Sequence, residues 1–163
     1  MRTLILLRHA KSDHPPGLSD RDRPLAARGT LDAPRMGQRL HGHGARLDRL
    51  ISSPAVRALA TARLMAAALQ YPSRRIIVDE RLYPGDAAQL LAVIRTLEQD
   101  TYQVMLVAHN PGLSELAHRC AAQITHLPTC AAAVFEYDGT WREFASIEFS
   151  RVTLETPRGA RSD

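Results

Sequence analysis

Near its start the chain reads Thr3-Leu4-Ile5-Leu6-Leu7-Arg8-His9-Ala10-Lys11-Ser12, an apolar run that ends in cationic and polar side chains. A short, continuous apolar segment is typical of a strand that is covered on both faces in a parallel sheet. The run therefore predicts a buried strand over residues 3–7. This strand would carry Arg8 and His9 at its carboxyl end.

The composition is that of a folded globular protein. With 163 residues, 45% of them apolar and 23% charged, the chain has the size of one α/β domain, which we expect to span residues 1–163. We find no signal-peptide cleavage site and no apolar run of membrane-spanning length. Cys120 and Cys130 lie outside any zinc-ligand or redox spacing. We therefore expect a cytoplasmic protein with two reduced cysteines and no membrane partner.

The net charge of +4 comes almost wholly from arginine, because Lys11 is the only lysine. A positive surface attracts anions, including nucleic acid, by long-range steering. The arginines are nevertheless spread along the chain without a basic run, and aromatic residues, which could stack on bases, make up only 5% of it. The charge therefore favours a phosphorylated or acidic partner over nucleic acid.

Further apolar segments alternate with helical patterns along the chain. The predicted strands are residues 47–51, 76–78 and 104–108, and the predicted helices are residues 26–43, 54–70, 86–98 and 110–121. Two more strands, residues 132–137 and 141–149, flank the two-residue hairpin signal Asp138-Gly139, and a frayed tail is expected from Thr156. This alternation predicts a three-layer α/β/α fold whose mostly parallel central sheet carries an antiparallel hairpin strand.

A strong helix-start signal, Ser52-Ser53-Pro54, follows the second predicted strand. Ser53 is the expected cap, and Pro54 suits the first helical position. The predicted core positions of this helix include Val56, Leu59, Leu64 and Met65.

Four cationic or titratable side chains come directly after predicted strands. Arg8 and His9 follow the first strand, Arg57 lies in the first helical turn after the second, and His109 follows the fourth. In parallel sheets, ligands bind beyond the carboxyl ends of the strands. Each residue alone is equally well explained by a solvated strand end, a helix cap or a structural histidine. Their joint placement favours a single site.

These residue types suit a phosphoryl group. The planar guanidinium of arginine matches phosphate oxygens, and the helix starts at Ser53 and Asn110 add backbone donors. A neutral imidazole can attack phosphorus, and neighbouring arginines disfavour its protonation. The sequence therefore predicts a pocket for a phosphoryl dianion with a histidine nucleophile.

The stretches that contain these side chains resemble the signature motifs of the histidine phosphatase superfamily, also called phosphoglycerate mutase-like. They are Arg8-His9, Ser52-Ser53-Pro54-x-x-Arg57-Ala58-x-x-Thr61-Ala62 and Val107-Ala108-His109-Asn110-Pro111-Gly112, in the family's order. More narrowly, Arg8-His9-Ala10-Lys11-Ser12, Leu18-Ser19-Asp20-x-Asp22-Arg23-Pro24-Leu25 and Asp79-Glu80-Arg81-Leu82-Tyr83 look like the compact bacterial SixA-type branch of phosphohistidine phosphatases. The resemblance covers most of the chain and implies a phosphoglycerate mutase-like fold.

The resemblance implies that His9 accepts the phosphoryl group and that water then hydrolyses the phosphohistidine intermediate. It implies that Arg8, Arg57 and His109 bind the phosphoryl oxygens and stabilise the transition state, as phosphoryl transfer requires. No metal ion or other cofactor is expected, because the sequence offers no carboxylate-rich cage. Asn110 joins the predicted phosphate-binding residues.

The general acid is the least defined role. Glu80 is the candidate, because its segment resembles the stretch that supplies this acid in the mutase branch, and a salt bridge to Arg81 or Arg75 is the structural alternative. Lys11 and Ser12 are expected at the phosphate rim. Asp20 and Asp22 are expected to tie down their own loop through salt bridges.

The short chain between the third and fourth strands bears on the substrate. About twenty residues separate Tyr83 from Val104, which leaves little chain to cover the site. An open site suits phosphate displayed on a protein, such as a histidine phosphotransfer domain. The alternatives are a broad phosphomonoesterase acting on small phosphate esters and, in another class, a noncatalytic module that binds phosphate or nucleic acid.

Overall fold

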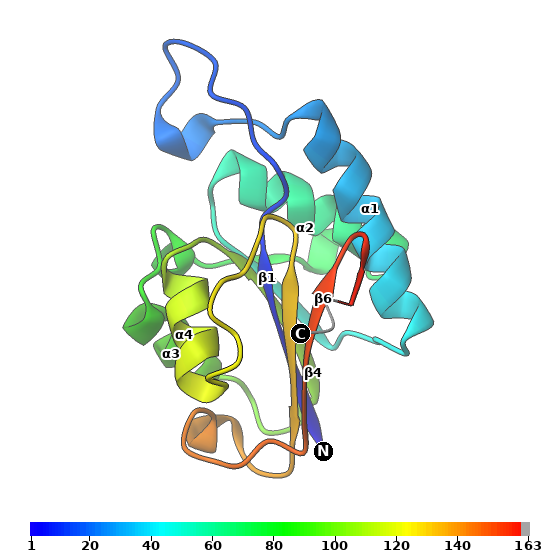
Figure 1. Ribbon diagram of the computed structural model, residues 1–163, viewed down its shortest axis with the longest axis vertical. Coiled ribbons are helices and arrows are strands. Elements are labelled where there is room, and N and C mark those ends of the chain that lie inside the picture. Colours follow the sequence, from blue (N-terminus) through cyan, green and yellow to red (C-terminus); the bar gives the residue numbers. More distant parts are fainter. Residues whose placement is uncertain (161–163) are drawn as a thin grey trace.

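The computed structural model describes residues 1–160, and a seven-stranded sheet forms the centre of this part of the chain (Figure 1). The strands, in the spatial order β3-β2-β4-β1-β5-β6-β7, are β1 (Arg2–Arg8), β2 (Arg49–Ser52), β3 (Ile77–Val78), β4 (Gln103–Ala108), β5 (Ala132–Tyr137), β6 (Arg151–Thr156) and β7 (Gly159–Ala160). Strands β3, β2, β4 and β1 pair in parallel, and β5, β6 and β7 add antiparallel pairs. The predicted α/β class is confirmed, and the sheet is mixed, with three parallel and three antiparallel strand pairs among the described residues.

Helices cover both faces of the sheet and give the three predicted layers. Helices α1 (Ala27–Gly42) and α2 (Val56–Ala68) lie on one face, and α3 (Ala87–Arg95) and α4 (Gly112–Cys120) lie on the other (Figure 1). Side chains of β1 alternate between the two apolar clusters, with Leu4 and Leu6 on the α3–α4 side and Ile5 and Leu7 on the α1–α2 side. This double burial explains the continuous apolar run in the sequence.

The parallel strands bring three chain segments to one edge of the sheet. Strand β1 pairs in register with β4, so that Arg8 lies opposite Ala108, and β4 in turn pairs with β2 up to Ser52. The residues that follow these strands, including His9, Ser53 and His109, therefore meet at the carboxyl edge, as predicted.

The predicted cap of α2 is wrong. The helix begins at Val56 with Ala55 at its cap position, so Ser53 and Pro54 lie before it. The Ser53 hydroxyl accepts a hydrogen bond from the Ala55 backbone N–H (3.1 Å), and its oxygen lies 2.7 Å from His109 Nε2. The sequence signal located the start of the helix to within a few residues. The Ser53 side chain, however, contacts His109, which follows β4, instead of capping α2.

Small residues form the buried side of α2, which differs from the predicted core. Met65 is buried as predicted, whereas Val56 is exposed and Leu59 and Leu64 are only partly buried. The buried residues are Arg57, Ala58, Thr61, Ala62, Met65 and Ala66. Helix α1 approaches so closely that a Cβ atom added at Gly37 would crowd that of Ala68, and small side chains are therefore required.

The predicted strand over residues 141–149 is also wrong, and so is its two-residue turn. Residues 138–150 form a longer connection that includes a 3₁₀ turn, Trp141–Glu143, before β6 begins at Arg151. Trp141 is fully buried, and its indole N–H donates to the Thr101 carbonyl at 2.8 Å. Its aromatic neighbours cover the end of the core instead of forming a strand.

The segment predicted as a frayed tail starts with regular structure, because β6 reaches Thr156 and pairs with β7. The rest of that predicted tail, residues 161–163, lies outside the described residues. None of the helices within residues 1–160 is long and apolar enough to span a membrane.

Candidate active site

A pocket of about 410 Å³ opens at the carboxyl edge of the sheet. Its lining residues come from the ends of strands β1 and β4, the first turn of α2 and the loops around them: Arg8, His9, Lys11, Ser12, His14, Asp20, Arg23, Arg57, Tyr83, Pro84, His109, Asn110 and Thr129. The pocket thus brings together every residue predicted for the site except Glu80.

His9 presents an unprotonated ring nitrogen in this pocket. Its Nδ1 lies 2.8 Å from the Ala10 carbonyl oxygen, which can only accept, so the proton resides on Nδ1 and Nε2 is bare. Burial, with smaller contributions from the charges of Arg57 and Arg8, lowers the pKa of His9 to about 4. The ring is therefore neutral at pH 7. The sequence predicted that neighbouring arginines would disfavour protonation of His9, but burial is the larger cause of its low pKa.

Arg57 is oriented by direct contacts with Asp20. Its Nε donates to His9 Nε2 at 3.3 Å, while Nη1 donates to the Asp20 carbonyl (2.5 Å) and Nη2 to the Asp20 carboxylate (3.0 Å). Only 5% of Arg57 is exposed. These contacts fix the guanidinium with its Nε–H facing the unprotonated Nε2 of His9.

Asp20 is the centre of a polar cluster that the sequence did not predict. Its carboxylate also accepts hydrogen bonds from the Tyr83 hydroxyl (2.7 Å) and from Arg23 Nη1 (2.9 Å). The Tyr83 hydrogen bond, followed by those from Arg23 and Arg57, holds the pKa of Asp20 well below its usual range. The salt bridge expected within the loop is formed with Arg23. The sequence did not predict the contacts with Arg57 and Tyr83, which are distant in the chain.

Asp22, the other loop aspartate, accepts a hydrogen bond from the Ser19 hydroxyl (3.1 Å) rather than forming the predicted salt bridge.

Arg8 brings a second guanidinium to the same place. Its Nη1 donates to the Leu127 carbonyl at 3.1 Å, and its buried Nε has no hydrogen-bond partner in the described structure. Burial lowers the pKa of Arg8, and the nearby charge of Arg57 adds to this effect. Two like charges held together in this way favour the binding of an anion between them.

His109 lies against two other aromatic rings of the pocket. Its ring centroid is 5.1 Å from that of His9 and 5.4 Å from that of Tyr83, and only 4% of the residue is exposed. Burial lowers the pKa of His109 to about 3, with smaller contributions from His9 and Arg57. His109 is therefore also neutral at pH 7.

The predicted rim residues line the pocket, but two of them have structural partners. The Ser12 hydroxyl accepts from Arg23 Nη2 (2.5 Å), and Asn110 Nδ2 donates to the Leu127 carbonyl (2.9 Å). The Asn110 Oδ1 atom accepts from the Ser114 hydroxyl at 2.8 Å. Lys11 is exposed and lines the pocket.

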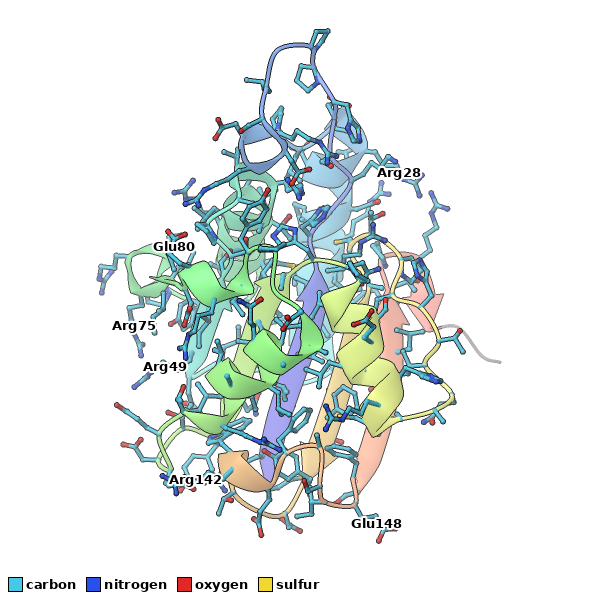
Figure 2. The ribbon with its side chains drawn as sticks, turned by 90° about the vertical axis from the view of Figure 1, so that its left-hand side faces the viewer. Arg28, Arg49, Arg75, Glu80, Arg142 and Glu148 are labelled. Carbon is cyan, nitrogen blue, oxygen red and sulfur yellow. The ribbon has the colours of Figure 1, made fainter. Side chains whose placement is uncertain are left out.

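Glu80 does not line the pocket. It lies at the periphery of the molecule (Figure 2), and its carboxylate pairs with Arg21 at 3.1 Å. The alternative salt bridge of Glu80 with Arg81 or Arg75 is not formed, because Glu80 pairs with Arg21 and Arg81 pairs with Asp79 at 2.7 Å. Its role as a general acid stays a prediction.

The pocket also contains His14, Arg23, Tyr83 and Thr129, which the sequence analysis did not assign. For Tyr83 a signal existed, because it follows the third strand of the parallel set, where the carboxyl-end rule applies. Among residues 1–160, no group of three or more His, Cys, Asp or Glu side chains is arranged to hold a metal ion.

Comparison with known proteins agrees with this geometry. The family model described as the histidine phosphatase superfamily (branch 1) matches residues 4–90. An uncharacterized protein of Mycobacterium leprae is 30% identical over 166 residues, which cover 93% of this chain and 100% of that protein.

Two solved structures are similar over nearly the whole length. A candidate phosphohistidine phosphatase SixA from Nakamurella multipartitia has a TM-score of 0.77 and 26% identity, and the match covers 93% of this chain and 94% of that one. The protein histidine phosphatase SixA in complex with tungstate shares the fold, with a TM-score of 0.80, 24% identity and coverage of 96% and 97%. With the family match over more than half its length, the chain belongs to the histidine phosphatase superfamily.

Proposed function

We propose that the protein hydrolyses phosphohistidine in another protein through a phosphohistidine intermediate on its own His9. The observation that carries this proposal is the bare Nε2 atom of a neutral His9, which lies 3.3 Å from the Nε atom of Arg57. Such a nitrogen is a competent nucleophile near neutral pH. The partner is a phosphorylated protein in the cytoplasm, such as a histidine phosphotransfer domain.

The reaction proceeds in two displacements. His9 Nε2 forms a bond to phosphorus while the bond from phosphorus to the substrate nitrogen breaks, and the released imidazole takes its proton from solvent. Water then attacks the same phosphorus, releasing inorganic phosphate and restoring the bare nitrogen. Arg8, Arg57 and His109 stabilise the charge on the phosphoryl oxygens, so the proposal requires no metal ion.

The acid–base groups of the pocket support a substrate with a good leaving group. Asp20 is the one carboxyl group of the described chain that lines the pocket, and its low pKa keeps it ionised. The Tyr83 hydroxyl already donates its hydrogen bond to Asp20. An alkoxide leaving group benefits from a proton donor, whereas a phosphorylated imidazole leaves more readily without one. The names of the SixA neighbours agree with this choice.

The two other functions remain weaker alternatives. A phosphomonoesterase acting on small esters would need an acid such as Glu80, which pairs with Arg21 outside the pocket. A noncatalytic module that binds phosphate or nucleic acid would not need a histidine with a bare nitrogen between arginines.

A rapid-quench experiment tests the covalent step. With a ³²P-phosphohistidine protein as substrate, denatured enzyme is expected to carry acid-labile, base-stable label on His9, and His9→Ala is expected to carry none. Hydrolysis should exceed that of a phosphoserine peptide or glycerol phosphate by roughly 10²-fold or more, the usual effect of a missing general acid on an alkoxide leaving group. Full turnover in His9→Ala would disprove the mechanism. Equal rates on all substrates would disprove the substrate assignment.

A further inference from the structure

The Ser53 side chain, which the sequence suggested as a helix cap, instead contacts the second histidine of the pocket. Ser53 is fully buried at the end of β2. Its hydroxyl oxygen lies 2.7 Å from His109 Nε2 and accepts the backbone N–H of Ala55 at 3.1 Å. The other ring nitrogen, His109 Nδ1, is buried and has no partner in the described structure.

The position of the proton on His109 follows from a count of donors and acceptors. A neutral imidazole carries one N–H, and burial keeps the pKa of His109 near 3. If Nε2 carried the proton, Ser53 would accept two N–H groups and its own buried hydroxyl proton would have no acceptor. If Nδ1 carries it, the hydroxyl donates to Nε2 and accepts from Ala55. Only the second arrangement satisfies the serine.

The resulting ring is complementary to that of His9. In His9 the Nδ1 proton is bound by the Ala10 carbonyl, which leaves a lone pair for phosphorus. In His109 the Nε2 lone pair is bound by Ser53, which leaves an N–H group without a protein partner. A phosphoryl oxygen has only lone pairs, so it would be repelled by a bare Nδ1 and attracted by a protonated one.

We propose that Ser53 is a positioning residue that fixes His109 as its Nδ1–H tautomer, so that this histidine donates a hydrogen bond to the phosphoryl group. The catalytic consequence rests on the proposed function, whereas the tautomer of the free protein does not. Because the donor is a neutral ring, the strength of this hydrogen bond does not change through protonation of His109 between pH 5 and 8.

Nitrogen NMR tests the tautomer directly. In ¹⁵N-histidine-labelled wild type at pH 7, the His109 signals, assigned by their loss in His109→Gln, should show a protonated Nδ1 and a bare Nε2. In Ser53→Ala the Nε2–H form should become populated. A wild-type spectrum with the proton on Nε2 would overturn the proposal without any variant.

Ligand binding and turnover test the consequence. Ser53→Ala should weaken binding of vanadate and lower kcat by roughly 10- to 100-fold, the cost of one hydrogen bond to a charged group. Ser53→Thr, which keeps a hydroxyl, should restore both the tautomer and most of the activity. Ser53→Ala with wild-type vanadate affinity and kcat would overturn the proposal, even if the variant is less stable.

A matched control lies next to Ser53. Ser52 is equally buried, and its hydroxyl donates to the Ser53 carbonyl at 2.9 Å without contacting His109. Ser52→Ala should leave the tautomer and vanadate affinity unchanged, and an effect equal to that of Ser53→Ala would reduce Ser53 to a structural role. If His9→Ala retains turnover, the proposed function fails, but the NMR result still decides the tautomer.

Discussion

Asp20 shows how one residue can organise the pocket by orienting an arginine. It holds Arg57 through two contacts, one from its carbonyl and one from its carboxylate, and it accepts the Tyr83 hydroxyl. These contacts leave Arg57 Nε facing His9. The geometry therefore makes the orientation of the arginine depend on a negative charge in a separate loop.

Replacing Asp20 by asparagine tests this dependence. Asp20→Asn keeps the shape but removes the charge that binds Arg57, and kcat should fall by roughly 10-fold, about the value of one charge-assisted hydrogen bond. The pKa of Tyr83, which Asp20 raises, should also return toward its ordinary value, as measured by absorbance titration with Tyr83→Phe as reference.

Asp22→Asn is the matched control, because Asp22 lies in the same 3₁₀ turn and accepts only the Ser19 hydroxyl. Wild-type kinetics in Asp20→Asn, or an equal loss in Asp22→Asn, would contradict the orienting role.

At this scale the sequence predicted where residues lie better than what they contact. Arg8, His9, Arg57 and His109 could be placed because each follows a strand of a parallel set. The contacts of Ser53 with His109 and of Asp20 with Arg57 join positions 56 and 37 residues apart. No local pattern encodes such pairs.

The elements around the pocket are held together by close backbone approaches. Helix α4 begins at Gly112, where an added Cβ atom would clash with the backbone oxygen of Gly85. Gly85 itself has φ +69° and follows the segment that carries Tyr83. The start of α4, directly after His109, is therefore packed against the loop that supplies the hydroxyl donor of Asp20.

Gly112→Ala should push this loop away from the helix. The expected loss of stability is about 1–3 kcal/mol, the usual cost of overpacking, and activity should fall because Tyr83 is displaced. Urea unfolding and kcat measure the two effects. Gly42→Ala is the control, since Gly42 ends α1 with open space around its Cβ position, and it should be nearly neutral. Equal stability of the two variants would refute the close approach.

The element that sequence reasoning misplaced is also explained by packing. Trp141 and Phe144 lie three residues apart, which suits a 3₁₀ turn better than the alternation of a strand. Both are fully buried against Phe135 and Tyr137 at the end of the core. Apolar content alone could not distinguish a strand from a turn that closes a core.

For the whole molecule, the two neutral histidines couple stability to pH. In the folded protein the pKa of His9 is about 4 and that of His109 about 3, whereas both lie near 6.5 in an unfolded chain. Between these values the unfolded state binds more protons, so stability falls as the pH is lowered below 6.5. Above that pH neither histidine contributes to the dependence.

The free energy of unfolding should therefore decrease from pH 6.5 to 5, with a slope that approaches about 1.4 kcal/mol per pH unit for each histidine. Urea denaturation at several pH values measures it. His109→Gln should remove about half of the slope. A flat profile in wild type would show that the rings are not held neutral by the fold.

The layer architecture was predictable at this scale, because doubly buried strands and amphipathic helices alternate along the chain. The order of the strands was not, since β4 enters the sheet between β1 and β2, and only the structure shows that pairing.

The buried indole of Trp141 has a practical consequence for spectroscopy. It is the only tryptophan of the chain, and it binds Thr101, just before β4, whereas His109 follows the other end of that strand. At about 3.3 Å per residue, a strand of this length places the fluorophore roughly 20 Å from the pocket. Its emission therefore reports the integrity of the core and not the occupancy of the pocket, and ligand effects on stability can be read without optical interference from binding.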